Sequence, residues 1–235
     1  MDLFKMNYNL FSKLSKPLAE RMRPKDLSFF VGQDNIIKNN SVLKNMIKNN
    51  RFSSMILYGP PGSGKTSLAN IISSSTDNYF VKISAVTSGT KEIKEIVELA
   101  KDNLSMYNKR TILFIDEIHR FNKMQQDYLL EYVENGDIIF IGATTENPAY
   151  EVNNALLSRV IVFELQTLSF ENLKDIIDNA ILNDEILKSK KISYTEDGIN
   201  YLIKMSNGDA RTALNYLELI VDNIESDEKI ISRDI

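Results

Sequence analysis

The stretch YGPPGSGKTS, residues 58–67, constrains the fold of this chain more than any other part of its sequence. Gly59, Gly62 and Gly64 are three of only nine glycines in the chain. Glycine reaches backbone angles closed to other residues and leaves no side chain to obstruct a close approach. Gly59–Thr66 also match the pattern G-x-x-x-x-G-K-[ST], in which backbone N–H groups at a helix start surround a phosphate. The stretch therefore predicts a phosphate-binding loop between a strand and a helix.

Two kinds of apolar pattern alternate along the chain around this loop. Short apolar runs typical of buried strands lie at 53–59, 79–84, 111–118, 138–145 and 160–165. Apolar residues at helical spacing lie at 36–49, 65–75, 91–104 and 125–136. Strands that alternate with helices favour a parallel sheet with both faces covered. The predicted fold class is therefore α/β, a parallel P-loop sheet flanked by helices.

The pattern changes after Leu165. The following segments that carry a periodic pattern are helical, at 169–182, 197–205 and 209–224, and no segment there is typical of a strand. We therefore expect an α/β domain over 36–166 and a small all-helical lid domain over 167–235. Residues 1–35 form a separate N-terminal segment, in which Pro24 interrupts any helix.

Composition excludes several classes of protein. The formal net charge of −4 argues against a globally basic nucleic-acid binder, although residues 1–25 are rich in Lys and Arg. That basic arm is either solvated or in contact with phosphates. With no Cys and one His, the chain cannot form disulfides, a Cys-ligated metal site or a His cluster. No apolar run approaches the roughly 18 residues that cross a membrane, and no signal-peptide pattern is present. We therefore expect a cytoplasmic protein without membrane contact.

Polar residues with a role in nucleotide chemistry follow the loop and a central strand. Lys65 would reach the β- and γ-phosphates, and the Thr66 hydroxyl would bind Mg²⁺. Asp116 and Glu117 follow the apolar run TILFI. The carboxylate of Asp116 can hold Mg²⁺, and that of Glu117 can orient and polarise an attacking water. These residues predict a site for a nucleoside triphosphate and Mg²⁺.

Other polar residues leave two interpretations open. Thr144 and Thr145 end a strand, where ligands of open α/β sheets bind, but a Thr there can also cap the turn before Pro148. Arg159 precedes a strand and Arg211 begins a helix, and each by itself is more typical of a surface charge. His119 is more typical of a packing or hydrogen-bonding residue than of a metal ligand.

Taken together, these residues resemble an AAA+ ATPase of the clamp-loader clade. Four stretches are similar to the family of replication-associated recombination protein A (maintenance of genome stability protein A), whose eukaryotic relative is the Werner helicase-interacting protein. They are PLAERMRPKDLSFFVGQ (17–33), DEIHRFNKMQQDYLLEYVENG (116–136), IGATTENPAYEVNNALLSR (141–159) and GDARTALNYLE (208–218). The resemblance covers nearly the whole chain.

The resemblance implies roles for individual residues. Thr145 takes the position of the first sensor and Arg211 that of the second, while Arg159 resembles an arginine finger that reaches the ATP of a neighbouring subunit. Val160 follows this arginine, where relatives often have Cys. The implied catalytic set is Lys65, Asp116, Glu117, Thr145, Arg159 and Arg211, with Thr66 and Asp116 as metal ligands. The implied nucleotide-binding set is Arg23, Pro24, Val31, Gly32 and Gln33 at the adenine, Gly59, Pro60, Pro61, Gly62, Ser63, Gly64, Lys65, Thr66 and Ser67 at the phosphates, and Arg211.

The resemblance also implies a function and partners. We expect a DNA-stimulated ATPase with ATP and Mg²⁺ as its ligands, active in replication-fork maintenance, recombination and DNA repair. The expected partners are forked or single-stranded DNA and replication and repair proteins such as a single-strand-binding protein. A bacterial member would associate with the nucleoid. Relatives continue into a helical region that forms homo-oligomers, which we expect to be absent from this chain.

Two other activities remain open at this point. One is a clamp-loader-like subunit that binds ATP without hydrolysing it, although intact Lys65, Asp116 and Glu117 argue against it. The other is a branch-migration motor of the same superfamily, which the stretches FNKMQQDYLL and TENPAYEVNN fit less well. A protein-remodelling ATPase would show an aromatic pore loop or a substrate-binding domain, and neither is evident.

Overall fold

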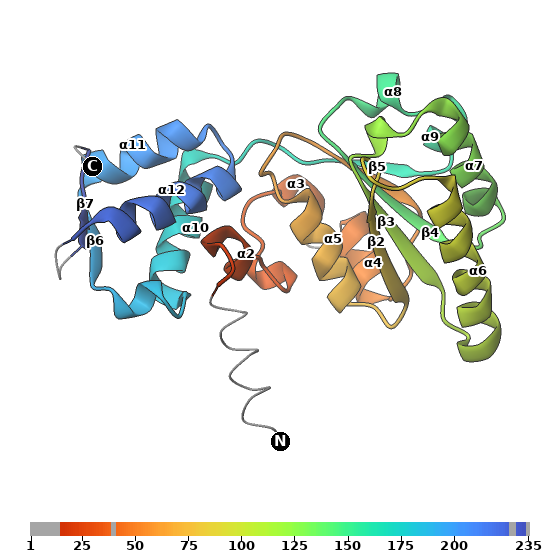
Figure 1. Ribbon diagram of the computed structural model, residues 1–235, viewed down its shortest axis with the longest axis horizontal. Helices are drawn as coiled ribbons and strands as arrows, with labels where there is room; N and C mark the ends of the chain where they lie inside the picture. The colour runs from red at the N-terminus through yellow and green to blue at the C-terminus, as the bar shows by residue number, and fades with distance from the viewer. Residues whose placement is uncertain (1–14, 39–40, 226–228, 234–235) are drawn as a thin grey trace. The chain divides into compact units, whose positions relative to one another are not determined.

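The chain folds into two compact units, and one boundary between them lies between Gln166 and Thr167. The computed structural model describes residues 15–38, 41–225 and 229–233 (Figure 1). Lys25–Gln166 form one unit, here called the α/β unit. The described residues before Lys25 and those from Thr167 onward form the other, here called the helical unit. Much of the predicted basic arm, residues 1–14, lies outside the described residues.

Five parallel strands form the sheet of the α/β unit, in the order β2–β3–β4–β1–β5. The strands are β1 (Met55–Tyr58), β2 (Tyr79–Ser84), β3 (Thr111–Asp116), β4 (Ile139–Thr144) and β5 (Ile161–Glu164). Each lies within the range predicted for it from the sequence, and all pairings are parallel. The predicted α/β fold class is therefore confirmed.

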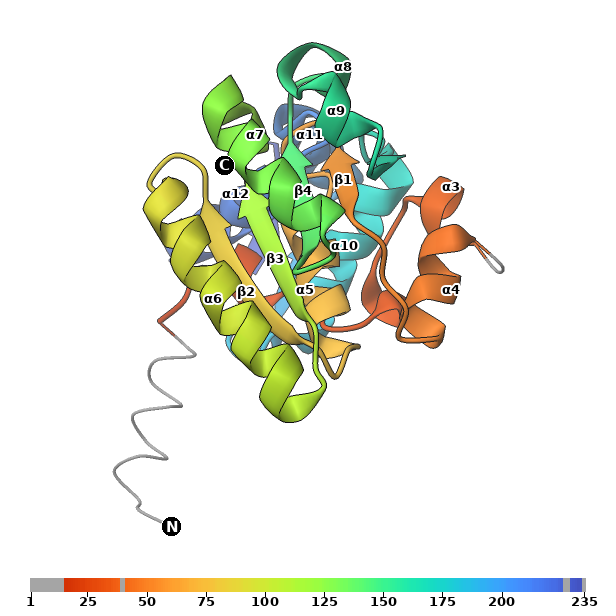
Figure 2. The same ribbon diagram turned by 90° about the vertical axis from the view of Figure 1, so that its right-hand side faces the viewer.

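Helices cover both faces of this sheet, and Figure 2 shows α6 and α7 on the face toward the viewer. The helical segments of the unit are η1 (Leu27–Phe29), α3 (Asp34–Ile37), α4 (Val42–Lys48), α5 (Lys65–Ser74), α6 (Thr90–Tyr107), η2 (Ile118–Arg120), α7 (Lys123–Glu134), α8 (Pro148–Glu151) and α9 (Asn154–Leu157). Side chains of α4 and α5 pack on the opposite face from those of α6 and α7.

The strands supply both cores because successive side chains point to opposite faces. Met55 and Leu57 pack with α5, whereas Ile56 between them packs with α6 and α7. All three side chains are fully buried. Continuous apolar strands are therefore required, and this requirement explains why the runs stood out in the sequence.

The single helix predicted over 36–49 is wrong, because the structure has two helices there. α3 ends at Ile37, and α4 begins after Ser41. The Ser41 hydroxyl accepts a hydrogen bond from the Lys44 N–H and so caps a new helix. Apolar spacing alone did not reveal this second start.

The helical unit contains α2 (Leu18–Arg21), α10 (Phe170–Asn183), η3 (Leu187–Ser189), β6 (Ile192–Tyr194), α11 (Glu196–Ser206), α12 (Ala210–Asn223) and β7 (Lys229–Ile231). The predicted helices at 169–182, 197–205 and 209–224 correspond to α10, α11 and α12. Their buried apolar faces form one core, which Leu18 of α2 joins.

The expectation that no strand follows Leu165 is wrong, because β6 and β7 form a two-stranded parallel sheet. Each strand is three residues long, too short for an alternating pattern to be recognised in the sequence. The sheet is packed tightly against α11, since a Cβ added to Gly198 would lie 2.4 Å from the Ile231 carbonyl oxygen. Glycine at the start of α11 allows this approach.

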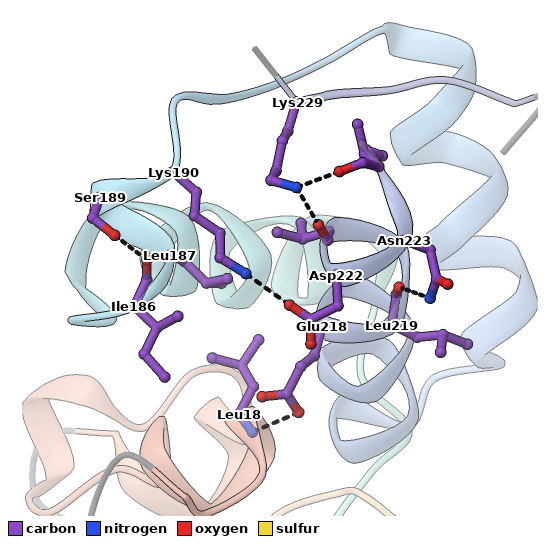
Figure 3. A network of polar contacts seen from close by, with 12 residues as sticks. Leu18, Ile186, Leu187, Ser189, Lys190, Glu218, Leu219, Asp222, Asn223 and Lys229 are labelled. Atoms are coloured by element: carbon purple, nitrogen blue, oxygen red, sulfur yellow. Dashed lines mark hydrogen bonds and ion pairs between the residues drawn. The ribbon is translucent and has the colours of Figure 1, made fainter. Parts of the chain in front are cut away.

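Polar contacts fasten α2 and η3 to α12 within the helical unit (Figure 3). The Leu18 N–H donates to Glu218 at 2.9 Å, and Lys190 Nζ donates to Asp222 at 2.7 Å. Arg21 donates to Asp184 at 2.7 Å and 3.0 Å and to Glu218 at 2.9 Å. The segment before Pro24 is thus held by residues 163 to 200 positions later.

None of the helices in the described parts of the chain is both long and apolar enough to cross a membrane.

Candidate functional site

The loop Gly59–Gly64 connects β1 to α5, and its glycines meet close contacts. A Cβ on Gly59 would lie 2.3 Å from the Leu165 carbonyl oxygen, and one on Gly64 would lie 2.8 Å from the Phe30 ring. Gly62 and Gly64 have φ of 67° and 105°, a region that favours glycine. The loop therefore has the tight main-chain path that its sequence predicted.

Lys65 begins α5 and is buried. Its ammonium donates to the carbonyl oxygens of Gly59 at 2.7 Å and Pro60 at 2.8 Å. The side chain thus folds back along the loop, which places its charge inside the loop's curve. Thr66 and Ser67 follow in the first turn of α5 and are partly exposed.

The start of α5 has no side-chain cap, a feature it shares with α2, α3 and α6. Its N-cap residue is Gly64, whereas α7, α10 and α12 are capped by Asn122, Ser169 and Asp209. The first N–H groups of a helix have no partner within it, and together they carry partial positive charge. An anion is a suitable partner for an uncapped helix start.

A buried hydroxyl in the loop also indicates that the loop binds phosphates. Ser63 Oγ is a buried side-chain polar atom with no hydrogen-bond partner among the described residues. Buried hydroxyls are nearly always paired, so this one fits a site whose polar ligand completes it. With the uncapped α5 and the Lys65 ammonium, the loop offers donors suited to phosphate oxygens.

The carboxyl ends of three neighbouring strands bring the other predicted residues to the same edge of the sheet. Thr144 of β4 pairs with Tyr58 of β1, and its carbonyl oxygen accepts from the Gly59 N–H at 3.2 Å. Asp116 is the last residue of β3, the next strand beyond β4. The structure therefore brings Asp116, Glu117, Thr144 and Thr145 to the edge where the loop begins.

Glu117 has an unusual backbone conformation, with φ of 59°, which non-glycine residues rarely adopt. Its carboxylate lies 3.2 Å from His119 Nε2, and His119 Nδ1 lies 2.9 Å from Thr144 Oγ1. Thr144 is fully buried, whereas Thr145 is partly exposed at the same edge. The hydroxyl bonded to His119 is therefore that of Thr144 and not that of the predicted sensor.

Asp116 has a cationic neighbour that sequence reasoning missed. Lys82 Nζ lies 3.9 Å from its carboxylate and 5.5 Å from the centre of the Phe114 ring. Lys82 is a lysine within the otherwise apolar run YFVKIS, and that was the available signal. No cluster of three or more His, Asp or Glu side chains suited to a metal occurs in the described residues. A Mg²⁺ ion that shares phosphate ligands needs only one or two carboxylates, and Asp116 can provide one.

Gln33 links the loop to the end of the α/β unit. Its side-chain amide donates to the Ser63 carbonyl oxygen at 3.2 Å and to that of Gln166 at 2.7 Å, and it accepts from the Gln166 N–H at 2.8 Å. Gly32 and Gln33 both have positive φ, at 72° and 61°. The structure thus places Gln33, one of the residues predicted to lie at the adenine, directly beside the phosphate-binding loop.

Arg159 lies away from this edge of the sheet. Ile161 starts β5 and pairs with Met55, the first residue of β1, whereas Gly59 follows the last residue of β1. A rise of about 3.3 Å per residue separates the two ends of β1 by about 10 Å. Arg159 instead forms an exposed ion pair with Glu134 at the end of α7. The structure therefore does not bring Arg159 to the loop of its own chain.

The remaining predicted residues belong to the helical unit. Arg23 and Pro24 follow α2, and Arg23 pairs with Glu20 at 2.5 Å. Arg211 is the second residue of α12, and its side chain is exposed. The Asp209 carboxylate caps this helix by accepting from the Arg211 N–H at 2.8 Å.

Comparison with known families gives two matches. The Holliday junction DNA helicase RuvB P-loop domain matches residues 22–160, and the AAA C-terminal domain matches residues 188–235. The first match covers the loop, the acidic pair, both threonines and Arg159. The second covers Arg211.

Similar proteins come from bacteria and eukaryotes. The chain is 45% identical to ATPase WRNIP1 of Dictyostelium discoideum over 213 residues, which are 91% of this chain and 24% of that protein. It is 45% identical to replication-associated recombination protein A of Escherichia coli over 215 residues, 91% of this chain and 48% of that protein. It thus spans about half or less of these relatives' length. Among solved structures, a variant of RuvB from Thermotoga maritima matches with a TM-score of 0.73 and 29% identity, covering 91% of this chain and 70% of that one.

Proposed function

Because this chain belongs to the AAA+ ATPase family of replication-associated recombination protein A and ATPase WRNIP1, we propose that it hydrolyses ATP in replication-fork maintenance and recombination. The observation that carries the proposal is the strand order of the α/β unit. It places the loop Gly59–Gly64 and the pair Asp116–Glu117 at one edge of the sheet, with β4 between them.

Binding of the phosphates is assigned to the loop and the start of α5. Backbone N–H groups and the positive end of α5 attract the phosphates. The Lys65 ammonium exchanges the carbonyl oxygens of Gly59 and Pro60 for phosphate oxygens, because it is attracted more strongly to negatively charged oxygens than to neutral carbonyl groups. Val31–Gln33 and Arg23–Pro24 are the proposed contacts of the adenine, and Arg211 of α12 is proposed to sense the bound nucleotide.

Hydrolysis is assigned to the acidic pair. Thr66 and Asp116 would hold Mg²⁺, which when bound neutralises negative charge on the phosphates. Glu117 accepts a proton from the attacking water and orients it. Thr145, at the end of β4, contacts the same water or the terminal phosphate. Every one of these residues except Thr66 ends or directly follows a strand of the sheet, so the sheet itself determines their spacing.

Arg159 is proposed to act on the ATP of a neighbouring subunit. Support comes from its position toward the amino edge of the sheet, away from the loop of its own chain. Its ion pair with Glu134 is exposed and therefore contributes little to stability, so a neighbour can displace it at small cost.

A branch-migration motor is the second candidate function, favoured by the likeness to RuvB. That likeness is at 29% identity, compared with 45% for replication-associated recombination protein A. We therefore place fork maintenance first. The preferred DNA structure distinguishes the two, because a branch-migration motor should respond most strongly to a four-way junction.

The proposal is tested by ATP turnover of this chain alone, with forked DNA and with a four-way junction. Lys65→Ala should lose nucleotide binding, measured by calorimetry. Glu117→Gln should keep binding and lose turnover by about 100-fold or more, the scale for removal of a general base. Wild-type binding by Lys65→Ala, or wild-type turnover by Glu117→Gln, contradicts the assignment of that residue. Turnover that neither DNA changes contradicts the DNA stimulation that the family resemblance implies.

A further inference from the structure

His119 joins Glu117, which directly follows β3, to Thr144, the last residue of β4. Its Nε2 atom lies 3.2 Å from the Glu117 carboxylate, and its Nδ1 atom lies 2.9 Å from the Thr144 hydroxyl. The imidazole is buried, with 8% of its side chain exposed. It is also the only histidine in the chain. Both ring nitrogens therefore have a partner, and neither partner is a backbone group.

Thr144, which contacts the His119 ring, is itself held in place by burial and by hydrogen bonds. Its side chain is fully buried at the end of β4. The hydroxyl accepts from the Glu146 N–H at 3.0 Å and lies 3.2 Å from the Glu146 carbonyl oxygen. The Thr144 backbone pairs with β1 and bonds to the Gly59 N–H. The network thus connects Glu117 to the strand that borders the phosphate-binding loop.

Hydrogen-bond roles in this network follow from counting protons. A neutral imidazole has one N–H and one acceptor nitrogen. An ionised Glu117 can only accept, so Nε2 carries the proton and Nδ1 accepts from the Thr144 hydroxyl. That hydroxyl has a single proton, so a bond donated to Nδ1 replaces the one it can otherwise donate to the Glu146 carbonyl oxygen at 3.2 Å. Glu117, which can only accept, therefore selects the tautomer with the proton on Nε2, and the Thr144 hydroxyl is then the donor to Nδ1.

Glu117 needs such a partner because its own surroundings restrain it little. About a third of its side chain is exposed, at 36%, and its carboxylate is carried on flexible bonds. The left-handed backbone at Glu117 sets where the side chain leaves the chain, but it does not set the carboxylate's orientation. His119, held by Thr144, provides that restraint.

We propose that His119 is a positioning residue, which orients the Glu117 carboxylate through Nε2 while Thr144 holds Nδ1. This proposal rests on the proposed function, in which Glu117 acts on the attacking water. It assigns no proton transfer to His119 and no contact with the nucleotide. Its consequence is that orientation of the carboxylate depends on β4 and on β3 together.

Nuclear magnetic resonance of the single histidine tests the contacts without any ATP. With ¹⁵N-histidine labelling, the two ring nitrogens give one pair of resonances at a fixed alkaline pH. Glu117→Gln should displace the Nε2 resonance, and Thr144→Val should displace the Nδ1 resonance. Glu98→Gln, an exposed substitution on α6, is the control and should leave both unchanged. Ring resonances that do not respond to Glu117→Gln overturn the proposal.

A matched pair of His119 variants tests the consequence for hydrolysis. The Gln amide nitrogen can take the place of Nε2, whereas the shorter Asn side chain reaches only toward the place of Nδ1. His119→Asn should lower kcat by about 10- to 100-fold, the scale for removing an orienting hydrogen bond at metal sites. His119→Gln should retain most of kcat, and ATP affinity should be unchanged in both. Equal kcat values for the two variants, high or low, overturn the proposal.

Failure of the proposal and failure of the proposed function give different results. If the wild-type chain binds ATP but never hydrolyses it, the proposed function is wrong, and the ring resonances alone decide whether His119 holds Glu117. If hydrolysis occurs and Glu117→Gln abolishes it, but the His119 ring resonances are the same in wild type and Glu117→Gln, only the role of His119 is wrong.

Discussion

Replacing Arg21 by alanine should destabilise the helical unit more than any surface substitution in it. The guanidinium donates to both oxygens of Asp184, at 2.7 Å and 3.0 Å, and to Glu218 at 2.9 Å. Only 6% of the Arg21 side chain and 3% of the Asp184 side chain are exposed. Truncation of Arg21 would leave the Asp184 carboxylate buried without its cation.

The expected magnitude follows from that burial. Removing one partner of a buried ion pair costs about 3–5 kcal/mol, chiefly because the remaining charge is left uncompensated. Asp184 would keep its bonds from the Ile186 and Leu187 N–H groups, which favours the lower half of this range. Since each 1.4 kcal/mol is a factor of ten, local opening of the unit should become at least about 100-fold more frequent.

Hydrogen exchange of this 235-residue chain measures the opening in peptides from α10 and α12. Lys190→Ala is the matched control, since its pair with Asp222 has a similar distance of 2.7 Å but leaves 58% of the Asp222 side chain exposed (Figure 3). Such a pair should contribute at most about 1 kcal/mol. An Arg21→Ala effect no larger than that of Lys190→Ala refutes the reasoning.

The pH dependence supplies a second check with a definite sign. Burial alone would raise the pKa of Asp184, but the hydrogen bonds and charge of Arg21, together with the Leu187 and Ile186 N–H groups, outweigh it, and the pKa lies below the ordinary value of 3.8. The contribution of Asp184 to stability is therefore present above pH 3.8 and is lost as the pH falls through the folded-state pKa. In the Arg21→Ala variant, only burial and the hydrogen bonds from backbone N–H groups still act on the pKa of Asp184. The difference in stability between the two proteins should thus shrink as the pH falls below about 4.

Three further predictions concern the α/β unit. Mixing Arg159→Ala with Lys65→Ala subunits should restore ATP turnover that neither variant shows alone. The Arg159→Ala subunit supplies an intact phosphate-binding loop, and the Lys65→Ala subunit supplies an intact arginine finger. Turnover that stays absent at every mixing ratio contradicts a finger that acts between subunits. Gly64→Ala should weaken ATP binding by about tenfold or more. The φ of 105° at this position costs an L-residue about 1–3 kcal/mol, and the new Cβ would meet the Phe30 ring. An unchanged Kd in calorimetry contradicts this prediction. Gln33→Ala should lower the free energy of unfolding by about 1–3 kcal/mol, because it leaves the carbonyl oxygen of the buried Ser63 unpaired. Denaturant titration checks it, and an unchanged free energy of unfolding would show that this bond matters little.

Much of the α/β unit was predictable because its signals are local. A buried parallel strand needs a continuous apolar run, and the run TILFI identified β3 whatever its neighbours were. The carboxyl end of such a strand is where ligands bind, so Asp116 and Glu117 were assigned to the site before the strand order was known. Short strands such as β6 lack enough residues for the same inference.

The roles of single polar side chains were less accessible. Lys82, Gln33 and His119 each lie beside a functional residue, yet each is an ordinary polar residue in its own segment. The resemblance to AAA+ ATPases placed Gln33 at the adenine, but it did not indicate a bond to Gln166. Contacts of this kind depend on which loops the sheet order brings together.

By itself, the sequence determined that this chain forms a phosphate-binding loop, since the glycine spacing of residues 59–64 and the following Lys65 leave few other backbone paths. It also determined that an acidic pair follows a buried strand. Only the tertiary structure decided that Arg159 lies toward the amino edge of the sheet, that His119 bridges Glu117 and Thr144, and that Arg21 fastens α2 to Asp184. The physical reason is distance along the chain. Glycine conformations and apolar runs act over a few residues, whereas the register of β5 on β1 and the burial of Arg21 join residues more than 100 positions apart.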